Sequence, residues 1–270
     1  MYKYQCKAGE EKMQEEVGKP VSYEALEMAL SLERFGRYMD WAKDDRTRAI
    51  ELYTLNTLIS ESLYTPLQML EVALRNRIHV VMTEAVNESW FHETGQLLGE
   101  WQPDQLAKAI HDIEEDRKEP TPGRIVAALT FSFWTAMFGK DYETLWQTTL
   151  HKIGRKPDGK GLRRKDFSGP LAQIRSLRNR IAHHEPIIMW NLPKRYESML
   201  EMTSWLSPPA AEWCQAHCRF LDVYPHAPIE LYQPPKEKKD QQAVAHEQPR
   251  EEPSGVEHVP VIASDPTQGG

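Results

Sequence analysis

The residues best suited to chemistry lie in one short segment, IRSLRNRIAHHEP (174–186), which contains Arg178, Asn179, His183 and His184. An arginine binds a phosphate group with its planar and permanently charged guanidinium. An imidazole changes protonation near neutral pH, so it can serve as a general acid or base. Arg178 and His183 form the only R-x4-H spacing in the chain. The segment therefore indicates chemistry on a phosphate, and its plain alternative is polar decoration of an exposed helix end.

The segment also lies at the end of a predicted helix. Glu185 precedes Pro186, which disfavours the α conformation at Glu185, so the helix is expected to end near His184. The C-terminal end of the helix dipole favours a protonated imidazole there. Five residues turn about 140° around a helix, so Arg178 and His183 do not share a face. We therefore expect a homodimer, in which two facing helices each contribute one arginine and one histidine to a shared cleft.

The pentapeptide LRNRI of this segment also occurs earlier, at 74–78, in a different context. The spacing from Arg75 to His79 is R-x3-H, one residue shorter, and no proline ends the helix there. Glu71 precedes Arg75 by four residues, a spacing that favours an ion pair on one helix face. We therefore predict that Glu71, Arg75 and Asn76 are structural polar residues, buried or placed at a helix interface.

Basic residues are concentrated in one part of an acidic chain. The net charge of −7 argues against nonspecific coating of nucleic acid. Between residues 152 and 180, however, ten lysines and arginines accompany two aspartates, a local charge of +8 that leaves −15 for the remainder. Such a segment indicates a local anion-binding site, and its plain alternative is a solvated loop.

Helical periodicity dominates the sequence, and no convincing alternating strand pattern is present. Thr65, Pro66 and Gln68 have the spacing of a capping box at a helix start, and Ser22 is a second candidate cap. The longest apolar run, 125–138, has 14 residues, which suits a buried helix better than a membrane span. A loop is expected at 154–168, and helices are predicted at 22–42, 47–62, 65–86, 103–118, 123–138, 142–152, 169–184, 193–206 and 208–223.

The two ends of the chain differ in composition from the rest. After Tyr232 there is no aromatic residue and there are six prolines, so a disordered polar tail is predicted at 233–270. A flexible N-terminus is expected at 1–20, which leaves one helical domain at 21–224. The N-terminus lacks the apolar core of a secretory signal, and the three cysteines are widely split. A cytoplasmic protein without membrane contact is therefore expected.

Four stretches of the sequence carry a family resemblance: RFGRYM (34–39), ELYTLNTLISESLYTPLQMLEVALRNRI (51–78), GRIVAALTFSFWTAMF (123–138) and IRSLRNRIAHHEPI (174–187). Together they resemble the Abi-like proteins of bacteria (abortive infection, AbiD/AbiF type), which belong to the HEPN superfamily. The last stretch is the most specific, since it resembles the HEPN signature R-x4-6-H. The resemblance extends over about residues 22–222, and Ser132 stands where glycine would be expected.

The resemblance implies an all-α, HEPN-type helical bundle with additional helices that forms a homodimer. It implies a metal-independent endoribonuclease without cofactor, acting as a toxin in phage defence and restrained by an antitoxin protein or a small RNA. Arg178 and His183 would be the catalytic pair, Asn179 would set their geometry, and His184 is the alternative histidine. Two other readings stay open: a non-catalytic module that binds RNA or a nucleotide, and a structural partner in a defence complex.

A consistent mechanism uses the RNA's own 2′-hydroxyl as the nucleophile. Two imidazoles would remove its proton and protonate the leaving 5′-oxygen, while two guanidiniums steady the phosphorane. The products would carry a 2′,3′-cyclic phosphate, and DNA would resist cleavage. The residues expected to contact the RNA backbone are Lys152, Arg155, Lys156, Lys160, Arg163, Arg164, Lys165, Arg175 and Arg180.

Overall fold

The structure is a computed structural model that describes residues 23–30, 32–93 and 97–232. Every regular element in these ranges is a helix, which confirms the predicted all-α class. The flexible N-terminus expected at 1–20 and the tail expected at 233–270 lie outside the described residues. The elements are α2 (Tyr23–Leu30), α3 (Leu32–Trp41), α4 (Arg46–Ser62), α5 (Tyr64–Ala85), η1 (Trp90–His92), α7 (Gln102–Glu115), α8 (Pro122–Ala128), α9 (Phe131–Ala136), η2 (Lys140–Tyr142), α10 (Glu143–Thr148), η3 (Leu150–Ile153), α11 (Arg164–Ala182), α12 (Leu192–Leu206), α13 (Pro208–His217) and α14 (Phe220–Val223).

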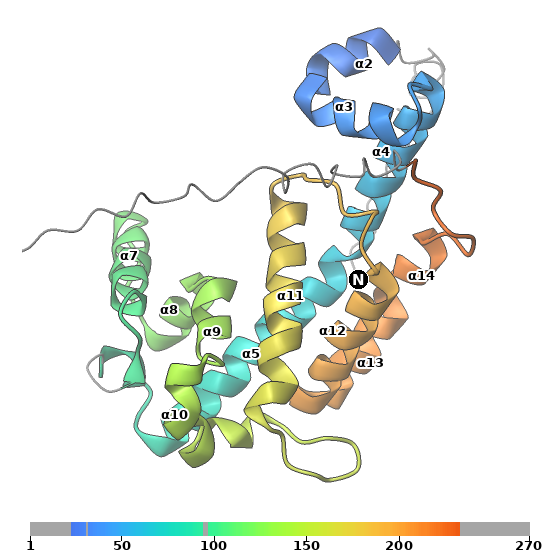
Figure 1. Cartoon of the computed structure of the whole chain (residues 1–270). Coiled ribbons are helices and arrows are strands. Elements are labelled where there is room, and N and C mark those ends of the chain that lie inside the picture. Colours follow the sequence, from blue (N-terminus) through green and yellow to red (C-terminus); the bar gives the residue numbers. More distant parts are fainter. Residues whose placement is uncertain (1–22, 31, 94–96, 233–270) are drawn as a thin grey trace, which may run out of the picture. The chain divides into compact units, whose positions relative to one another are not determined.

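Helix α5 is the element against which most of the others pack. It contacts α4, α8, α9, α12, α13 and η3, and it runs through the middle of the view in Figure 1. Its buried side chains recur every three or four residues, so they form an apolar stripe along the helix. They include Leu67, Leu70, Leu74, Ile78 and Val81.

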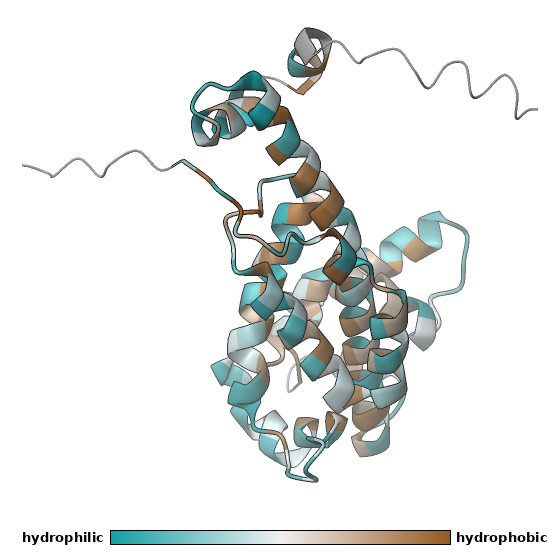
Figure 2. Cartoon of the chain, turned by 90° about the vertical axis from the view of Figure 1, so that its right-hand side faces the viewer, coloured by the Kyte–Doolittle hydropathy of each residue, from teal (hydrophilic) through white to brown (hydrophobic). Residues whose placement is uncertain are grey.

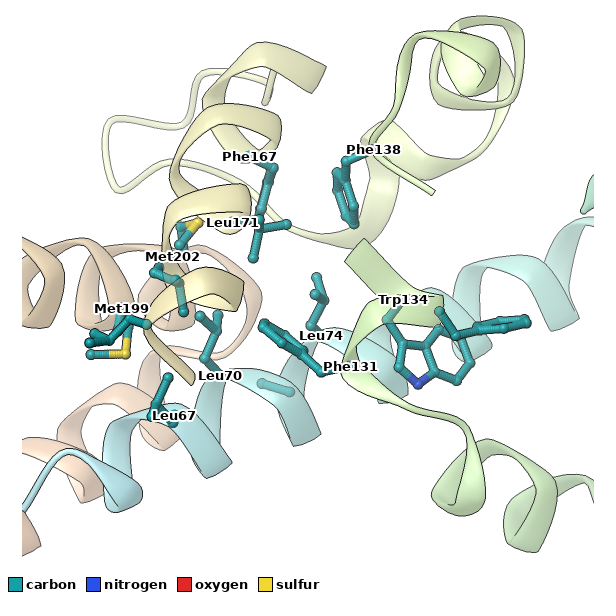
Figure 3. Close-up of a cluster of buried hydrophobic side chains, with 14 of the residues drawn as sticks. Leu67, Leu70, Leu74, Phe131, Trp134, Phe138, Phe167, Leu171, Met199 and Met202 are labelled. Carbon is teal, nitrogen blue, oxygen red and sulfur yellow. The ribbon is translucent and has the colours of Figure 1, made fainter. Parts of the chain in front are cut away.

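Helix α11, which carries the R-x4-H residues, is held by an apolar stripe of its own. The buried residues of α11 are Phe167, Leu171, Ile174, Leu177 and Ile181. The helix packs on α9 and α12, and Figure 3 shows side chains of α5, α9, α11 and α12 meeting in one core. Each such side chain contributes about 1.5–3 kcal/mol when it is fully buried. The rotation of α11 about its axis is therefore fixed by burial, and so is the direction of its polar residues.

The helices predicted at 22–42 and at 123–138 are each divided in two. The segment predicted as one helix at 22–42 forms α2 and α3, and its expected cap Ser22 lies outside the described residues. The segment predicted at 123–138 breaks between α8 and α9. Leu129 and Thr130 are extended there, and the hydroxyl of Thr130 accepts a hydrogen bond from the N–H of Phe133 at 3.3 Å. A threonine that caps a new helix competes with continuation of the old one.

Three other boundaries also differ from the prediction. The capping box at Thr65 is wrong, because α5 begins at Tyr64 directly after the buried Leu63 and has no side-chain cap. Helix α11 begins inside the predicted loop, at Arg164, because the Asp166 carboxylate accepts a hydrogen bond from the N–H of Arg163 at 3.0 Å. The last predicted helix is divided into α13 and α14 at residues 218–219.

The segment after α11 is fastened to α4 by a buried amide. The side chain of Asn56, which is only 5% exposed, accepts hydrogen bonds at Oδ1 from the N–H groups of Ile187 at 2.7 Å and Ile188 at 3.3 Å. Both isoleucines are buried as well. The polypeptide that leaves the helix end at His183 and His184 is therefore fixed in place within a few residues.

The described part of the chain continues past the predicted domain end at residue 224. The N–H of Tyr232 donates a hydrogen bond to the carbonyl of Trp41 at 2.9 Å, and Lys43 lies 4.8 Å from the centre of the Tyr232 ring.

Figure 2 shows apolar and polar residues side by side on the helices, as expected where one face is buried. None of the described helices combines the length and hydropathy that a membrane crossing requires.

We predict that Asn56→Ala lowers the free energy of unfolding by about 2–3 kcal/mol, because it leaves two buried N–H groups without an acceptor. Urea denaturation followed by circular dichroism measures the change. Thr57→Ala is the matched control, since Thr57 is the exposed neighbour on the same helix and its hydroxyl bonds only the carbonyl of Tyr53. A loss no larger in Asn56→Ala than in this control would contradict the assigned role of Asn56.

Candidate functional site

Helix α11 ends in a Schellman motif that contains both candidate histidines. His183 is the C-cap, the N–H of His184 bonds the carbonyl of Ile181 at 3.0 Å, and the N–H of Glu185 bonds that of Arg180 at 2.8 Å. His184 occupies the left-handed position with φ 56°, where glycine is usual. This conformation costs a histidine about 1–2 kcal/mol, and such strain concentrates at functional sites.

The rotation of α11 sends its polar residues in different directions. Asn179 and His183 are four residues apart, so they share one face, and both are exposed. That face points away from the buried stripe. Around the helix axis, His183 lies about 120° from Leu177, which belongs to the stripe. Arg178 is half-buried and lies beside the stripe, facing α5. Within one chain, therefore, Arg178 and His183 diverge, as their spacing predicts.

The two copies of LRNRI meet at one cavity between α5 and α11. In each copy the leucine and the isoleucine are buried, at Leu74 and Ile78 and at Leu177 and Ile181. In each copy the first arginine lines the same cavity of about 350 Å³. We call this the α5–α11 cavity; its charged lining residues are Glu71, Arg75 and Arg178, and its other lining residues are Tyr64, Leu67, Gln68, Val72, Ile181 and Ala182.

Two features of the first copy differ from the prediction, namely the ion pair of Glu71 with Arg75 and the placement of Asn76. The expected ion pair between Glu71 and Arg75 is not formed; instead Arg75 Nη1 donates a hydrogen bond to the carbonyl of Ala127 in α8 at 3.2 Å. Glu71 forms no ion pair or hydrogen bond with any described residue. Burial raises the pKa of Glu71, and the positive charges of Arg178 and Arg75 oppose this shift. Asn76 is exposed, because it points away from the apolar stripe of α5.

A second cavity, again of about 350 Å³, lies on the other flank of the α11 end, against α3. We call it the α3–α11 cavity. His184, Arg180, Arg34 and Arg37 line it together with Glu33, Glu185, Pro186 and Met189. Arg180 is held in place by an ion pair with Glu185 at 2.9 Å and by stacking on Trp190, whose ring centre lies 5.5 Å away. His183 therefore stands in the chain between Ala182, which lines the first cavity, and His184, which lines the second.

The basic loop before α11 lies at the opposite end of that helix (Figure 1). A helix rises 1.5 Å per residue, so Arg164 and His183 are separated by about 28 Å along the axis. Lys152, Arg155 and Lys165 are exposed, Arg175 is half-buried, and none of the four forms an ion pair with a described residue. Four other basic residues that were predicted to contact RNA form ion pairs with carboxylates. Lys156 and Arg163 bind Asp166, Lys160 binds Asp158, and Arg164 binds Glu143.

These ion pairs stabilise the start of α11. Burial acts to raise the pKa of Asp166, but hydrogen bonds from Arg163 and Lys156 outweigh it and lower the pKa to about 2. Arg164 also donates to the carbonyl of Phe138 at 2.8 Å, and the N–H of Arg155 donates to that of Trp205 at 3.0 Å. The loop is therefore attached to the helices around it, and part of its positive charge is neutralised locally.

Sequence reasoning did not select Arg34 and Arg37 as site residues, and it assigned Glu71 and Arg75 only structural roles. Arg34 and Arg37 are three residues apart on a helix with strong amphipathic character, which puts them on one polar face. That spacing was the available signal, but the proximity of α3 to the end of α11 is tertiary. In the described ranges, no three His, Cys, Asp or Glu side chains gather as a metal site.

Comparison of the chain with protein-family models, with curated proteins and with solved structures found no match in any of the three. The candidate site therefore stands on the geometry described above and on the resemblance carried by the segment 174–187.

We predict opposite stability effects for glycine at the two histidines. His184→Gly removes the left-handed strain of about 1–2 kcal/mol. Glycine also loses more conformational entropy on folding, which offsets part of this gain, so the variant should be more stable by about 0.5–1 kcal/mol. His183→Gly should destabilise by a similar amount, because the φ of −90° at His183 suits any residue. Urea denaturation of both variants decides the matter, and equal destabilisation by the two would refute the strain assignment.

We predict that Glu71→Gln raises the melting temperature at pH 7.5. Because the folded-state pKa of Glu71 lies above 4.5, the folded state favours the protonated carboxyl. The protonated carboxyl therefore contributes to stability in full below pH 4.5, and this contribution is lost as the pH rises through the raised pKa. At neutral pH the ionised form of Glu71 disfavours folding. Thermal melts from pH 4 to 8 should show a gain in the variant that disappears toward pH 4.

Glu84→Gln is the control for this pH series, since Glu84 is exposed on the same helix. A surface substitution of this kind should change stability by no more than about 0.5 kcal/mol at any pH. A Glu71→Gln variant that melts below the wild type at pH 7.5 would show that Glu71 stabilises the fold, contrary to the assignment.

Proposed function

We propose that the chain is a metal-independent endoribonuclease that cleaves RNA through attack of the 2′-hydroxyl. The observation that carries this proposal is the arrangement at the end of α11, where two exposed imidazoles adjoin two arginine-lined cavities: Ala182, next to His183, lines one cavity, and His184 lines the other. Successive phosphates of a single strand could bind the arginines on either side and pass across the imidazoles. The resemblance of the segment 174–187 to the HEPN signature supports the same reaction.

The side chains can be given distinct roles in this reaction. Arg178, with its fixed positive charge and planar donors, would bind oxygens of the reacting phosphate. His183 would take the proton of the 2′-hydroxyl or give one to the leaving 5′-oxygen. The bond from phosphorus to the 5′-oxygen breaks as the bond to the 2′-oxygen forms, which leaves a 2′,3′-cyclic phosphate and a 5′-hydroxyl. Arg34, Arg37 and Arg180 would bind the next phosphate of the strand.

Two opposite proton transfers are best served by two imidazoles, and a homodimer supplies them. The face of α11 opposite the buried stripe carries Ala172, Ser176, Asn179 and His183, all exposed. Small residues there allow two helices to approach closely, and two-fold symmetry would then place one His183 beside its mate. Asn179 is one turn from His183 on this face, so its amide could orient the imidazole across the interface.

The biological role rests on the family resemblance alone. The proposal is a toxin that stops growth on phage infection by cleaving cellular RNA. A protein antitoxin or a small RNA would restrain it in uninfected cells.

The test is cleavage of RNA by purified protein in the presence of EDTA. We expect wild type to give fragments ending in a 2′,3′-cyclic phosphate, identified by mass spectrometry, and to leave an all-deoxy strand intact. His183→Ala should lower the rate by about 10²–10⁴-fold, because it removes a general acid or base. Arg178→Lys should also be slow, since a lysine lacks the planar fork of donors.

The matched control is His226→Ala, which removes an exposed histidine far along the chain from α11 and should leave the rate unchanged. His184→Ala is assayed beside it, and a rate loss confined to His184→Ala would transfer the proton-transfer role to that residue. If wild type and His183→Ala cleave at the same rate, the assignment of His183 fails. Sedimentation at several concentrations reports whether the active species is a dimer.

A further inference from the structure

Four side chains of α5 line the α5–α11 cavity in a row, and each has a different chemical character. Tyr64, Gln68, Glu71 and Arg75 are spaced by four, three and four residues, so they lie in a row on one face. Arg178 of α11 lines the cavity opposite them. The volume of about 350 Å³ is at the small end of the range for ligand sites in proteins. The row offers, in order, an aromatic ring, an amide, a carboxylate and a guanidinium.

The carboxylate of Glu71 determines what kind of group fits. A cavity built only for phosphate has no use for a carboxylate, because the two negative groups repel each other. Glu71 forms no ion pair with Arg75 or Arg178, although the positive charges of both arginines act to lower its pKa. Glu71 accepts no hydrogen bond from any described residue, so its oxygens are left to accept from a ligand that donates.

Among the four RNA bases, guanine alone offers two adjacent donors, N1–H and the N2 amino group, which match the two oxygens of an ionised carboxylate. Its other edge carries the acceptors O6 and N7, to which an arginine donates two hydrogen bonds. Arg75 stands one turn from Glu71 and uses one of its five donors on Ala127, which leaves the others for a ligand. Adenine, cytosine and uracil each set an acceptor beside their donor, which a carboxylate repels.

We propose that the α5–α11 cavity is a guanine-nucleotide subsite. Glu71 accepts from N1 and N2 of the base, Arg75 donates to its O6 edge, and Arg178 binds the adjoining phosphate. Tyr64, whose side chain is 65% exposed at the rim of the cavity, supplies a ring on which the base stacks. The inference rests on the proposed function, because it assigns the base next to the phosphate that Arg178 holds in the cleavage reaction. It makes the enzyme selective for RNA that carries an unpaired guanine.

The experiment measures binding without cleavage. Fluorescence anisotropy of the full chain is recorded with trinucleotides UGU, UIU, UAU, UCU and UUU, each 2′-O-methylated throughout so that no nucleophile is present. We expect UGU to bind about tenfold or more tightly than UAU, as a bidentate contact to a base provides. Inosine lacks the N2 amino group, so UIU should fall between them. Equal affinities for all five would overturn the proposal.

Variants locate the preference in the cavity. Glu71→Gln should weaken UGU to the level of UAU while leaving UAU unchanged, and Tyr64→Ala should weaken all five because stacking is tolerant of sequence. Glu84→Gln, an exposed position on the same helix, is the control and should change nothing. A guanine preference that persists in Glu71→Gln would overturn the assignment, and circular dichroism confirms that each variant is folded.

Cleavage assays separate this inference from the proposed function. Unmodified RNA that is cut next to every base alike, by wild type and Glu71→Gln equally, would overturn the guanine subsite and leave the nuclease. A guanine preference in binding, lost in Glu71→Gln, together with no cleavage of any RNA, would support the subsite and refute the nuclease. Cleavage concentrated at guanines in wild type alone would support both.

Discussion

The hydrogen bonds that Asn56 accepts from Ile187 and Ile188 are the constraint on which the candidate site depends. They satisfy two buried N–H groups within a few residues of the αL turn at His184, so the chain cannot leave α11 in another direction. The cost of leaving such groups unpaired is about 1–3 kcal/mol each, a large fraction of the stability of a domain. Because the exit is fixed, His184 remains in its strained conformation and lines the α3–α11 cavity.

The repeated LRNRI shows how one pentapeptide can serve two helices in the same way. In both copies the leucine and isoleucine are buried and the first arginine faces the cavity between the helices. The copies differ in their downstream sequence, because Pro186 comes soon after the second copy, whereas α5 continues past the first to Ala85. Only the second copy therefore has imidazoles at a helix end. The first copy supplies the cavity wall instead, with Glu71 one turn earlier.

Much of this architecture could be predicted from periodicity, because apolar residues at three- and four-residue spacing must be buried on one side of a helix. The divergence of Arg178 and His183 could likewise be predicted from helical geometry. The breaks at Thr130 and before Arg164 could not, since each is decided by one side-chain hydrogen bond that periodicity does not register. The pairing of Arg75 with Ala127 instead of Glu71 depends on α8, which is 52 residues away in sequence.

Charge density along the chain was a poor guide to charge density in space. The run of basic residues before α11 contains its own counterions, and Asp166 and Glu143 neutralise part of it about 28 Å from the histidines. Part of the positive charge beside the histidines comes from a distant part of the sequence, since Arg34 and Arg37 of α3 are brought to the end of α11 only by packing, whereas Arg178 and Arg180 belong to α11 itself. An RNA strand attracted to this end would respond to those arginines. The acidic remainder of the chain would keep it from binding elsewhere.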